Sequence, residues 1–220
     1  MLGRRKKIDR ALRERGVPPE VTHVERDDRK TTAGPYDILD APGGDEPTLD
    51  FGALIVPVDP RFEVRLEIAT DGSVGGVSLM RDGSILQLGV FAAPRSGGAW
   101  DDIRSDISSE IERNGGRREQ IDGEFGPELR AAIVNDGGTQ DARFIGVDGP
   151  RWFLRALIAG PAAIDDDVAA DFLELFRRVV VNRGTEPKPV REPLTLQLPA
   201  ALASQVEEAA SERDDGTVEA

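Results

Sequence analysis

The 220-residue sequence contains no cysteine, a single histidine and only 5% aromatic residues. Without cysteine the chain can form no disulfide and has no thiolate chemistry, and one histidine cannot supply the usual ligands of a zinc site. The histidine, His23, lies in a polar stretch with no neighbouring nucleophile, so we expect a solvated residue rather than the base of a catalytic triad. The sequence therefore predicts no metal site, no cofactor and no catalytic residue.

Long apolar runs are also lacking. No run approaches the roughly 18 residues that a membrane-spanning helix needs, and the basic N-terminus is not followed by the apolar segment of a signal peptide. Hydrophobic residues make up 39% of the chain and charged residues 31%, a composition that fits a folded middle with polar ends. We expect a cytoplasmic protein, and the absence of cysteine fits a reducing compartment.

Charge is spread unevenly along this acidic chain, whose net charge is −13. Residues 1–15 carry seven basic and two acidic side chains, a net of +5, whereas residues 200–220 carry six acidic side chains and one basic, a net of −5. We expect a disordered N-terminal tail over 1–48, a single domain over 49–199 and an acidic C-terminal tail over 200–220. The basic cluster Arg4–Lys7 could contact nucleic acid or a membrane, but a solvated tail is the better interpretation.

Alternating apolar and polar residues predict a mostly antiparallel sheet. Residues 62–68 alternate strictly, as in a strand with one buried face, and Asp71-Gly72 and Asp82-Gly83 are hairpin turn signals. Eight strands are predicted in total: 51–58, 62–68, 74–80, 84–92, 117–121, 129–134, 142–147 and 151–158. Leu194, Leu196 and Leu198 also alternate, so this segment should add an edge strand or pack as an arm.

Two segments instead show helical spacing. Trp100, Ile103, Ile107 and Ile111 recur every three or four residues and share one helix face, and a second apolar face runs from Val168 to Val179. We therefore expect the α+β class, with roughly eight strands and two main helices packed on one face of the sheet.

The segment Arg95, Ser96, Gly97 and Gly98 is the first candidate site. It is a glycine-rich loop before a helix, and helix N-termini can bind phosphate. The loop lacks the P-loop pattern, and Asp101 and Asp102 would repel an anion, so a structural turn is the competing interpretation. Arg151 is a second candidate, because it begins a strand that carries Trp152 and Arg155. Strand alternation places Trp152 in the core and Arg155 on the opposite face.

Two groups of acidic residues have simpler explanations than a site. The run Asp165–Asp167 precedes an apolar helix, so we expect it to cap that helix and to interact with its dipole rather than to bind a cation. Glu124 and Glu128 could form a carboxylate pair, but nothing orients them toward a nucleophile, so we expect both on the surface.

Several blocks together resemble the actinobacterial family of domain of unknown function 3710 (DUF3710). They are GPYD (34–37), LDFGALIVP (49–57), FAAPRSGGAWDDIR (91–104), GEFGPELRA (123–131), RFIGVDGPRWFLR (143–155), VVVNRG (179–184) and PVREPLTLQLP (189–199). The resemblance implies a cytoplasmic actinobacterial protein and carries no known activity or catalytic residue. The order of elements also looks loosely like the Mog1/PsbP fold, an analogy that implies no function.

Three functions remain open from the sequence. We favour a non-enzymatic binding or adaptor module whose partner is another protein. The first alternative is a small-ligand protein or enzyme that holds an anion with the Arg95–Gly98 loop. The second is nucleic-acid binding through the basic N-terminus.

Overall fold

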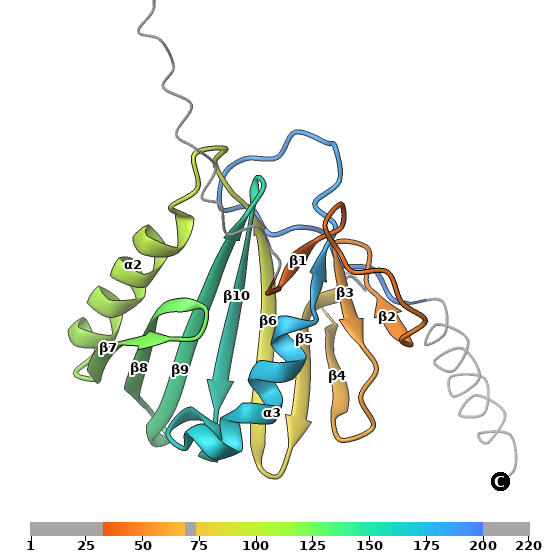
Figure 1. Cartoon of the computed structure of the whole chain (residues 1–220). Helices are drawn as coiled ribbons and strands as arrows, with labels where there is room; N and C mark the ends of the chain where they lie inside the picture. Colours follow the sequence, from red (N-terminus) through yellow and green to blue (C-terminus); the bar gives the residue numbers. More distant parts are fainter. Residues whose placement is uncertain (1–32, 69–73, 200–220) are drawn as a thin grey trace, which may run out of the picture.

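The computed structural model describes residues 33–68 and 74–199, and its main element is a seven-stranded antiparallel sheet (Figure 1). The strand order is β4-β5-β6-β10-β9-β8-β7. The strands of this sheet are β4 (Glu63–Ile68), β5 (Val74–Arg81), β6 (Ser84–Ala92), β7 (Arg117–Gly123), β8 (Gly126–Asn135), β9 (Gly138–Gly149) and β10 (Trp152–Ala159).

A smaller four-stranded sheet has the order β1-β11-β3-β2. Its strands are β1 (Tyr36–Asp37), β2 (Thr48–Asp50), β3 (Leu54–Pro57) and β11 (Val180–Val181). The remaining elements are the helices α2 (Ala99–Arg113) and α3 (Asp166–Arg177) and the short 3-10 helix η1 (Pro161–Ala163). All eight predicted strands and both predicted helices are confirmed within the described residues, and so is the α+β class. The likeness to the Mog1/PsbP fold stays a prediction.

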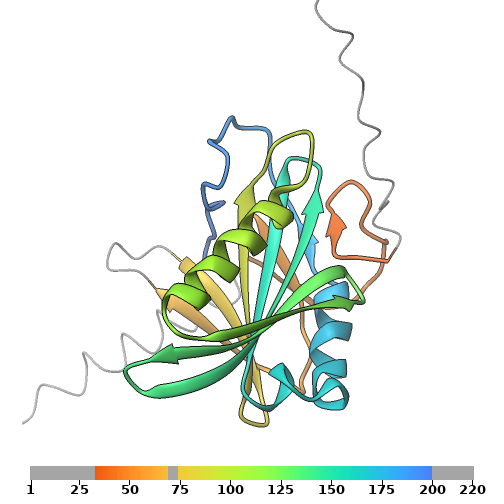
Figure 2. The same ribbon diagram turned by 90° about the vertical axis from the view of Figure 1, so that its left-hand side faces the viewer.

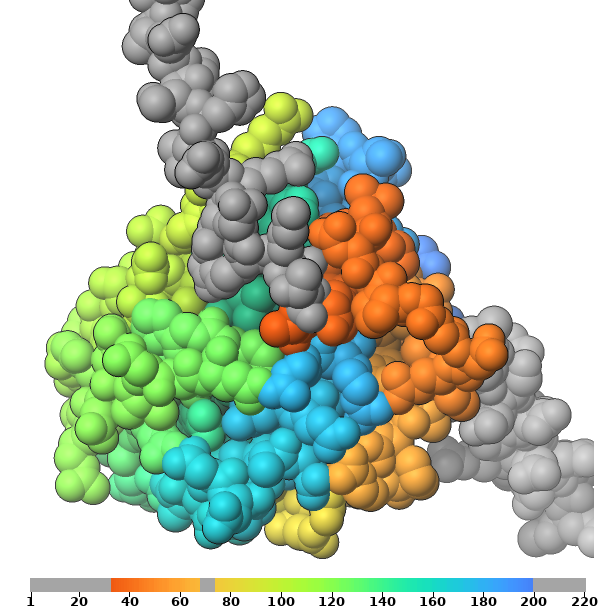
Figure 3. Space-filling view, viewed as in Figure 1, coloured from red at the N-terminus to blue at the C-terminus, as the bar shows by residue number. Residues whose placement is uncertain are grey.

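The two helices pack on opposite faces of the main sheet, so the expectation that both cover one face is wrong. Phe172 and Phe176 of α3 belong to the larger buried cluster together with Trp152 and Leu154. Trp100 of α2 belongs to a second cluster, which contains Phe153 of the same strand β10. Successive side chains of a strand point to opposite faces, so the two clusters lie on the two sides of the sheet. Figure 2 shows α2 in front of the sheet, with α3 to its right, and Figure 3 shows α3 filling the space between the β7–β8 hairpin and the smaller sheet.

The two helices begin differently, α3 with a side-chain cap and α2 without one. The Asp165 side chain accepts hydrogen bonds from the N–H groups of Asp167 and Val168 at 2.9 and 3.3 Å, so the predicted cap of α3 is confirmed. Helix α2 instead follows Gly98, whose φ of 81° is left-handed and which offers no side chain as a cap. None of the helices among the described residues is long and apolar enough to cross a membrane.

Both ends of the described chain contact the main sheet. The sequence predicts that residues 33–48 belong to the N-terminal tail. In the structure, however, Tyr36 of strand β1 pairs with Val180. The buried Asp37 carboxylate accepts a 2.7 Å hydrogen bond from the Trp152 indole. At the other end Leu194 and Leu196 are buried, and Leu196 forms isolated bridges to Gly52 and Val74. This segment therefore packs as an arm, one of its two predicted arrangements. The predicted tails over 1–32 and 200–220 lie outside the described residues.

Candidate functional site

Three loops meet at one end of the main sheet and bring together the residues that the sequence singled out. They are the segment 93–98 before α2, the β9–β10 turn at 150–151 and the segment 182–192 after β11. The Ala93 N–H donates to the Arg151 carbonyl at 2.9 Å, and the Ala92 N–H donates to the Glu192 carbonyl at 2.9 Å. Figures 1 and 2 both place the three loops at this end of the sheet, which we call the loop end.

The Arg95–Gly98 segment forms a tight turn before α2. Gly97 and Gly98 have φ angles of 70° and 81°, a left-handed conformation that residues with a Cβ rarely adopt. The Gly97 N–H donates to the Pro94 carbonyl at 3.3 Å. Arg95 and Ser96 are exposed at the tip of this turn, so the backbone geometry accounts for the two glycines without a ligand.

The N-terminus of α2 already has an anion beside it. The Trp100 N–H lies 3.3 Å from both carboxylate oxygens of Asp148, which projects from the end of β9. A carboxylate at this position satisfies a free N–H and interacts favourably with the helix dipole. An external phosphate at the same place would meet the charge of Asp148, so the loop is poorly suited to bind an anion through the helix N-terminus.

Arg151 occupies a strained position in the turn between β9 and β10. Its φ of 64° is left-handed, and it follows Pro150, which matches a type II turn with proline at the second position. Glycine or asparagine is the usual residue at the third position of this turn, and another residue there costs of order 1 kcal/mol. The structure thus holds a long cationic side chain at a position where a glycine would cost less.

Arg183 comes to the same end from a different part of the chain. Strand register places Val181 opposite Asp37, the residue that bonds Trp152, so the chain arrives beside the β9–β10 turn. The Arg183 guanidinium donates to the carbonyls of Gly184 and Glu186, while its buried Nε has no hydrogen-bond partner. The pKa of Arg183 is lowered, first by burial and second by the like charge of Arg151.

The third cation nearby, Arg191, is neutralised. Its guanidinium forms ion pairs with Asp106 at 3.0 Å and Asp102 at 3.8 Å, and these pairs attach the segment after β11 to α2. Within the part of the chain that the structure describes, neither Arg95, Arg151 nor Arg183 forms an ion pair with an acid. The loop end therefore collects three arginines that have no carboxylate partner within 33–68 and 74–199.

A comparison with family models decides the family. The model of a protein family described as "Protein of unknown function (DUF3710)" matches residues 34–205. The chain belongs to the DUF3710 family. A search of the curated proteins found no match. The matched range begins at Gly34, and so it includes strand β1 and Asp37 along with the loop end.

Two glycines of the DUF3710 blocks lie where a larger residue would clash with a tryptophan ring. A Cβ on Gly149 would lie 2.0 Å from the Trp152 ring, and a Cβ on Gly146 would lie 2.2 Å from the Trp100 ring. Both distances are far below van der Waals contact, so each tryptophan ring can pack here only because the residue beneath it is a glycine. The block RFIGVDGPRWFLR thus supplies the two glycines on which the tryptophans pack, the Asp148 carboxylate and Arg151.

Glu124 and Glu128 do not form a carboxylate pair, and Glu128 is not on the surface as predicted. Glu124 forms an ion pair with Arg177 on α3. Glu128 is 0% exposed, and it accepts a 2.6 Å hydrogen bond from the buried Arg143 on β9. Arg143 also lies 2.9 Å from Asp166, so these charges connect the sheet to the first turn of α3. The prediction failed because α3 covers the polar face of β8.

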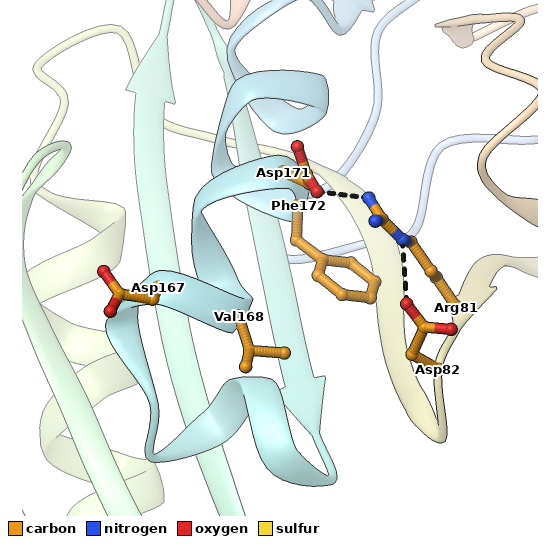
Figure 4. A pocket seen from close by; sticks show the side chains of 6 residues that line it. All are labelled: Arg81, Asp82, Asp167, Val168, Asp171 and Phe172. Carbon is orange, nitrogen blue, oxygen red and sulfur yellow. Dashed lines mark hydrogen bonds and ion pairs between the residues drawn. The ribbon is translucent and has the colours of Figure 1, made fainter.

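A hollow of about 270 Å³ lies on the α3 side of the DUF3710 domain, and Figure 4 shows the side chains that line it. Arg81 crosses it and forms ion pairs with Asp82 at 3.0 Å and with Asp171. Asp167 points away from this arginine, and Phe172 lies behind the pair. The full lining is Arg81, Asp82, Asp167, Val168, Asp171 and Phe172. Since its cation is already paired with carboxylates, we interpret the hollow as a contact between β5 and α3 rather than as a binding site.

The ion pairs beside this hollow should make stability depend on pH. Asp59 accepts hydrogen bonds from the Arg61 Nε and Nη2 at 3.0 and 2.7 Å and from Arg178 at 3.3 Å. The Arg61 guanidinium holds the pKa of the Asp59 carboxyl well below its usual range. A carboxyl with a lowered pKa stabilises the fold above its ordinary pKa near 4, and this stabilisation is lost as the pH falls through the lower value.

Asp59→Asn is therefore expected to lower the free energy of unfolding at pH 7 by about 1 kcal/mol or less, as befits a partly exposed ion pair. The difference between variant and wild type should shrink as the pH falls from about 4 to about 2. Urea unfolding at pH 7, 4 and 2.5 measures it. A difference that stays constant over this range would contradict the assignment of the effect to the Asp59 carboxylate.

Proposed function

We propose that the DUF3710 domain is a non-enzymatic binding module that recognises an anionic group on a protein partner. Arg151 and Arg183 would hold the anion, with Arg95 at the rim of the loop end. The observation that carries the proposal is that Arg151 and Arg183 reach the loop end from two parts of the chain, near enough for the charge of Arg151 to lower the pKa of Arg183 after the larger effect of burial. Neither is paired with an acid among the described residues.

Elementary electrostatics supports this assignment. Two like charges brought together disfavour each other's charged form, and burying a guanidinium nitrogen without an acceptor costs free energy. An oxyanion between the two arginines would relieve both costs. Guanidinium groups match phosphate and carboxylate with paired hydrogen bonds, and arginine clusters recur in modules that read phosphorylated or acidic motifs.

The strained backbone at Arg151 points the same way. Strain that a glycine would remove is often kept where a side chain has a task. The alternative of an enzyme that holds its ligand with the Arg95–Gly98 loop is less favoured, because Asp148 occupies the N-terminus of α2. No three histidine, cysteine or acidic side chains in 33–68 and 74–199 are grouped as metal ligands. Binding of nucleic acid or membrane through Arg4–Lys7 concerns residues outside the described ranges.

Calorimetric titration with O-phosphoserine, inorganic phosphate and glutamate tests the proposal. We expect O-phosphoserine to bind, and Arg151→Gly and Arg183→Gln each to weaken binding at least about tenfold, since charge-assisted hydrogen bonds are the strong ones. Arg151→Gly should keep or raise the melting temperature, because glycine tolerates the left-handed turn. Binding should also weaken as salt is raised.

Arg117→Gln is the matched control, because Arg117 is an exposed arginine on the edge strand β7. This variant should bind O-phosphoserine like the wild type. If Arg151→Gly and Arg183→Gln bind the three anions with unchanged affinity, or if none of the anions binds the wild type at millimolar concentration, the arginines of the loop end are not the binding site.

A further inference from the structure

Arg155 is a cation in the middle of the main sheet, on the face that carries α2. Its strand neighbours across β10 are Gly89 on β6 and Gly146 on β9. Neither neighbour has a side chain of its own, and aromatic rings take the space instead: the Trp100 ring lies over Gly146 and the Phe91 ring beside Gly89. The terminal nitrogen Nη2 would be 3.8 Å from a Cβ built on Gly89, which fixes the guanidinium above this glycine.

This cation has no acidic partner in the part of the chain that the structure describes. Its Nε is buried and has no hydrogen-bond acceptor, and desolvation lowers the pKa of the Arg155 guanidinium. Among the described residues its compensating contact is the Phe91 ring, whose centroid lies 5.5 Å from the guanidinium carbon. A cation over a phenyl ring gains much less than an ion pair in a desolvated site. Arg155 therefore remains an under-compensated charge.

Charged side chains of β4 on the same face are paired, whereas the buried Ser78 hydroxyl of β5 has no partner among the described residues. Arg65 lies 2.9 Å from Glu63 on β4, and the Gln87 amide donates to Glu67. Buried polar groups in native proteins nearly always find partners, so an exception calls for an explanation. The carboxylates of this face lie on β4, three strands from β10, and already have partners. Arg155 therefore takes no part in this network.

The surroundings of Arg155 combine an apolar surface with open sheet. Phe91 stacks on Phe153 with ring centroids 5.9 Å apart, and Phe153 stacks on Trp100 at 5.9 Å. Phe91 and Leu157 are only partly buried and flank Arg155 on the neighbouring rows of the sheet. The buried cluster under α2 draws its sheet residues from β8, β9 and β10, so this helix leaves the β4–β6 half of the face uncovered.

We propose that Arg155 and Phe91 form a second site, which binds a small organic oxyanion: a carboxylate or phosphate carried on an apolar body. The planar guanidinium would take the oxyanion with two parallel hydrogen bonds. The apolar body would lie against Phe91 and Leu157, which are both only partly buried. This site is separate from the loop end and does not rest on the proposed function.

Titration of the ¹⁵N-labelled full chain with benzoate, phenyl phosphate and benzamide tests the proposal. Benzamide is the neutral match of benzoate and should bind at least about tenfold more weakly than the two anions. The amide signals of Gly89 and Gly146 should move, because they lie on either side of Arg155. The affinities for benzoate and phenyl phosphate tell whether the site prefers a carboxylate or a phosphate. Phenyl phosphate should also bind more tightly than inorganic phosphate, which lacks the apolar body.

Variants separate a binding role from a structural one. Arg155→Gln should weaken benzoate at least about tenfold, Arg155→Lys should weaken it less, and Arg151→Gly should leave it unchanged. Arg155→Met should raise the melting temperature of the free protein by a few degrees, because an unpaired buried charge is replaced by an apolar chain. Equal binding of benzamide and benzoate, unchanged binding in Arg155→Gln, or a lowered melting temperature in Arg155→Met would each overturn the proposal.

Discussion

Trp152→Ala is expected to lower the free energy of unfolding by about 3–5 kcal/mol, as for other fully buried large aromatic side chains. The Trp152 side chain is 0% exposed and packs in the larger core cluster between the main sheet and α3. Its loss leaves a cavity, because the ring lies directly over Gly149, which has no side chain to fill the space. With stabilities of about 5–15 kcal/mol usual for small domains, the variant should be marginal or unfolded at room temperature.

Trp152→Phe separates the hydrogen bond from the packing. Phenylalanine keeps most of the apolar contact but leaves the buried Asp37 carboxylate without its 2.7 Å indole donor. We expect a loss of about 1–3 kcal/mol, which is the cost of an unsatisfied buried acceptor. Among the described residues the carboxylate then keeps only its 3.1 Å hydrogen bond from the Leu39 N–H. Asp37→Asn should restore part of this loss in the double variant, since a buried neutral amide that lacks one partner costs less than a buried carboxylate that lacks one.

Urea unfolding followed by far-UV circular dichroism measures both changes, because the tryptophan fluorescence itself changes in these variants. Leu39→Ala is the control: Leu39 is 90% exposed, two residues from Asp37, and its truncation should change stability by less than about 0.5 kcal/mol. If Trp152→Phe were as stable as wild type, the Trp152–Asp37 bond would not attach β1 to the core.

The contact between Trp152 and Asp37 shows what the sequence could and could not predict. Strand alternation placed Trp152 in the core, and the structure confirms it. The partner Asp37 could not be found in the same way, because β1 has two residues and therefore no hydrophobic period. Its surroundings are rich in charge, proline and glycine, so composition assigned residues 33–48 to a tail, although GPYD was visible as a block of the family.

The faces of the sheet that the two helices cover could not be predicted, for a related reason. Strand β10 is buried on both faces, with Trp152 toward α3 and Phe153 toward α2. A strand buried on both faces reads as a continuous apolar run, which does not tell on which side a helix packs. The alternation in 62–68 was clear because β4 lies at the edge of the sheet and its charged face is exposed.

The candidate site was predicted in part. Arg95 and Arg151 were singled out, and the structure brings their loops together, but Arg183 was missed because a lone arginine in a polar stretch has no pattern. Asp148 was missed as well, since its role depends on the approach of α2 from another part of the chain. The block VVVNRG, quoted for the family resemblance, contains Arg183 and is the signal that could have drawn attention to it.

The buried pair of Glu128 and Arg143 gives the second large effect. Arg143→Met removes the 2.6 Å partner of a carboxylate that is 0% exposed, while Asp166 keeps its ion pair with Arg130. Breaking a buried ion pair on one side leaves an uncompensated charge, so we expect a loss of about 3–5 kcal/mol. Glu128→Leu alone should cost less, because the buried Arg143 keeps its 2.9 Å ion pair with Asp166.

The double variant Glu128→Leu/Arg143→Met should recover most of this loss, since apolar residues of similar volume often replace a buried ion pair at little cost. Urea unfolding of the four proteins gives the coupling energy as a double-mutant cycle. Arg118→Met is the matched control: Arg118 forms an exposed ion pair with Glu112 at 2.8 Å, and its loss should cost at most about 1 kcal/mol. Losses that simply add in the double variant would mean that Glu128 and Arg143 stabilise the fold independently and not as an ion pair between β8 and β9.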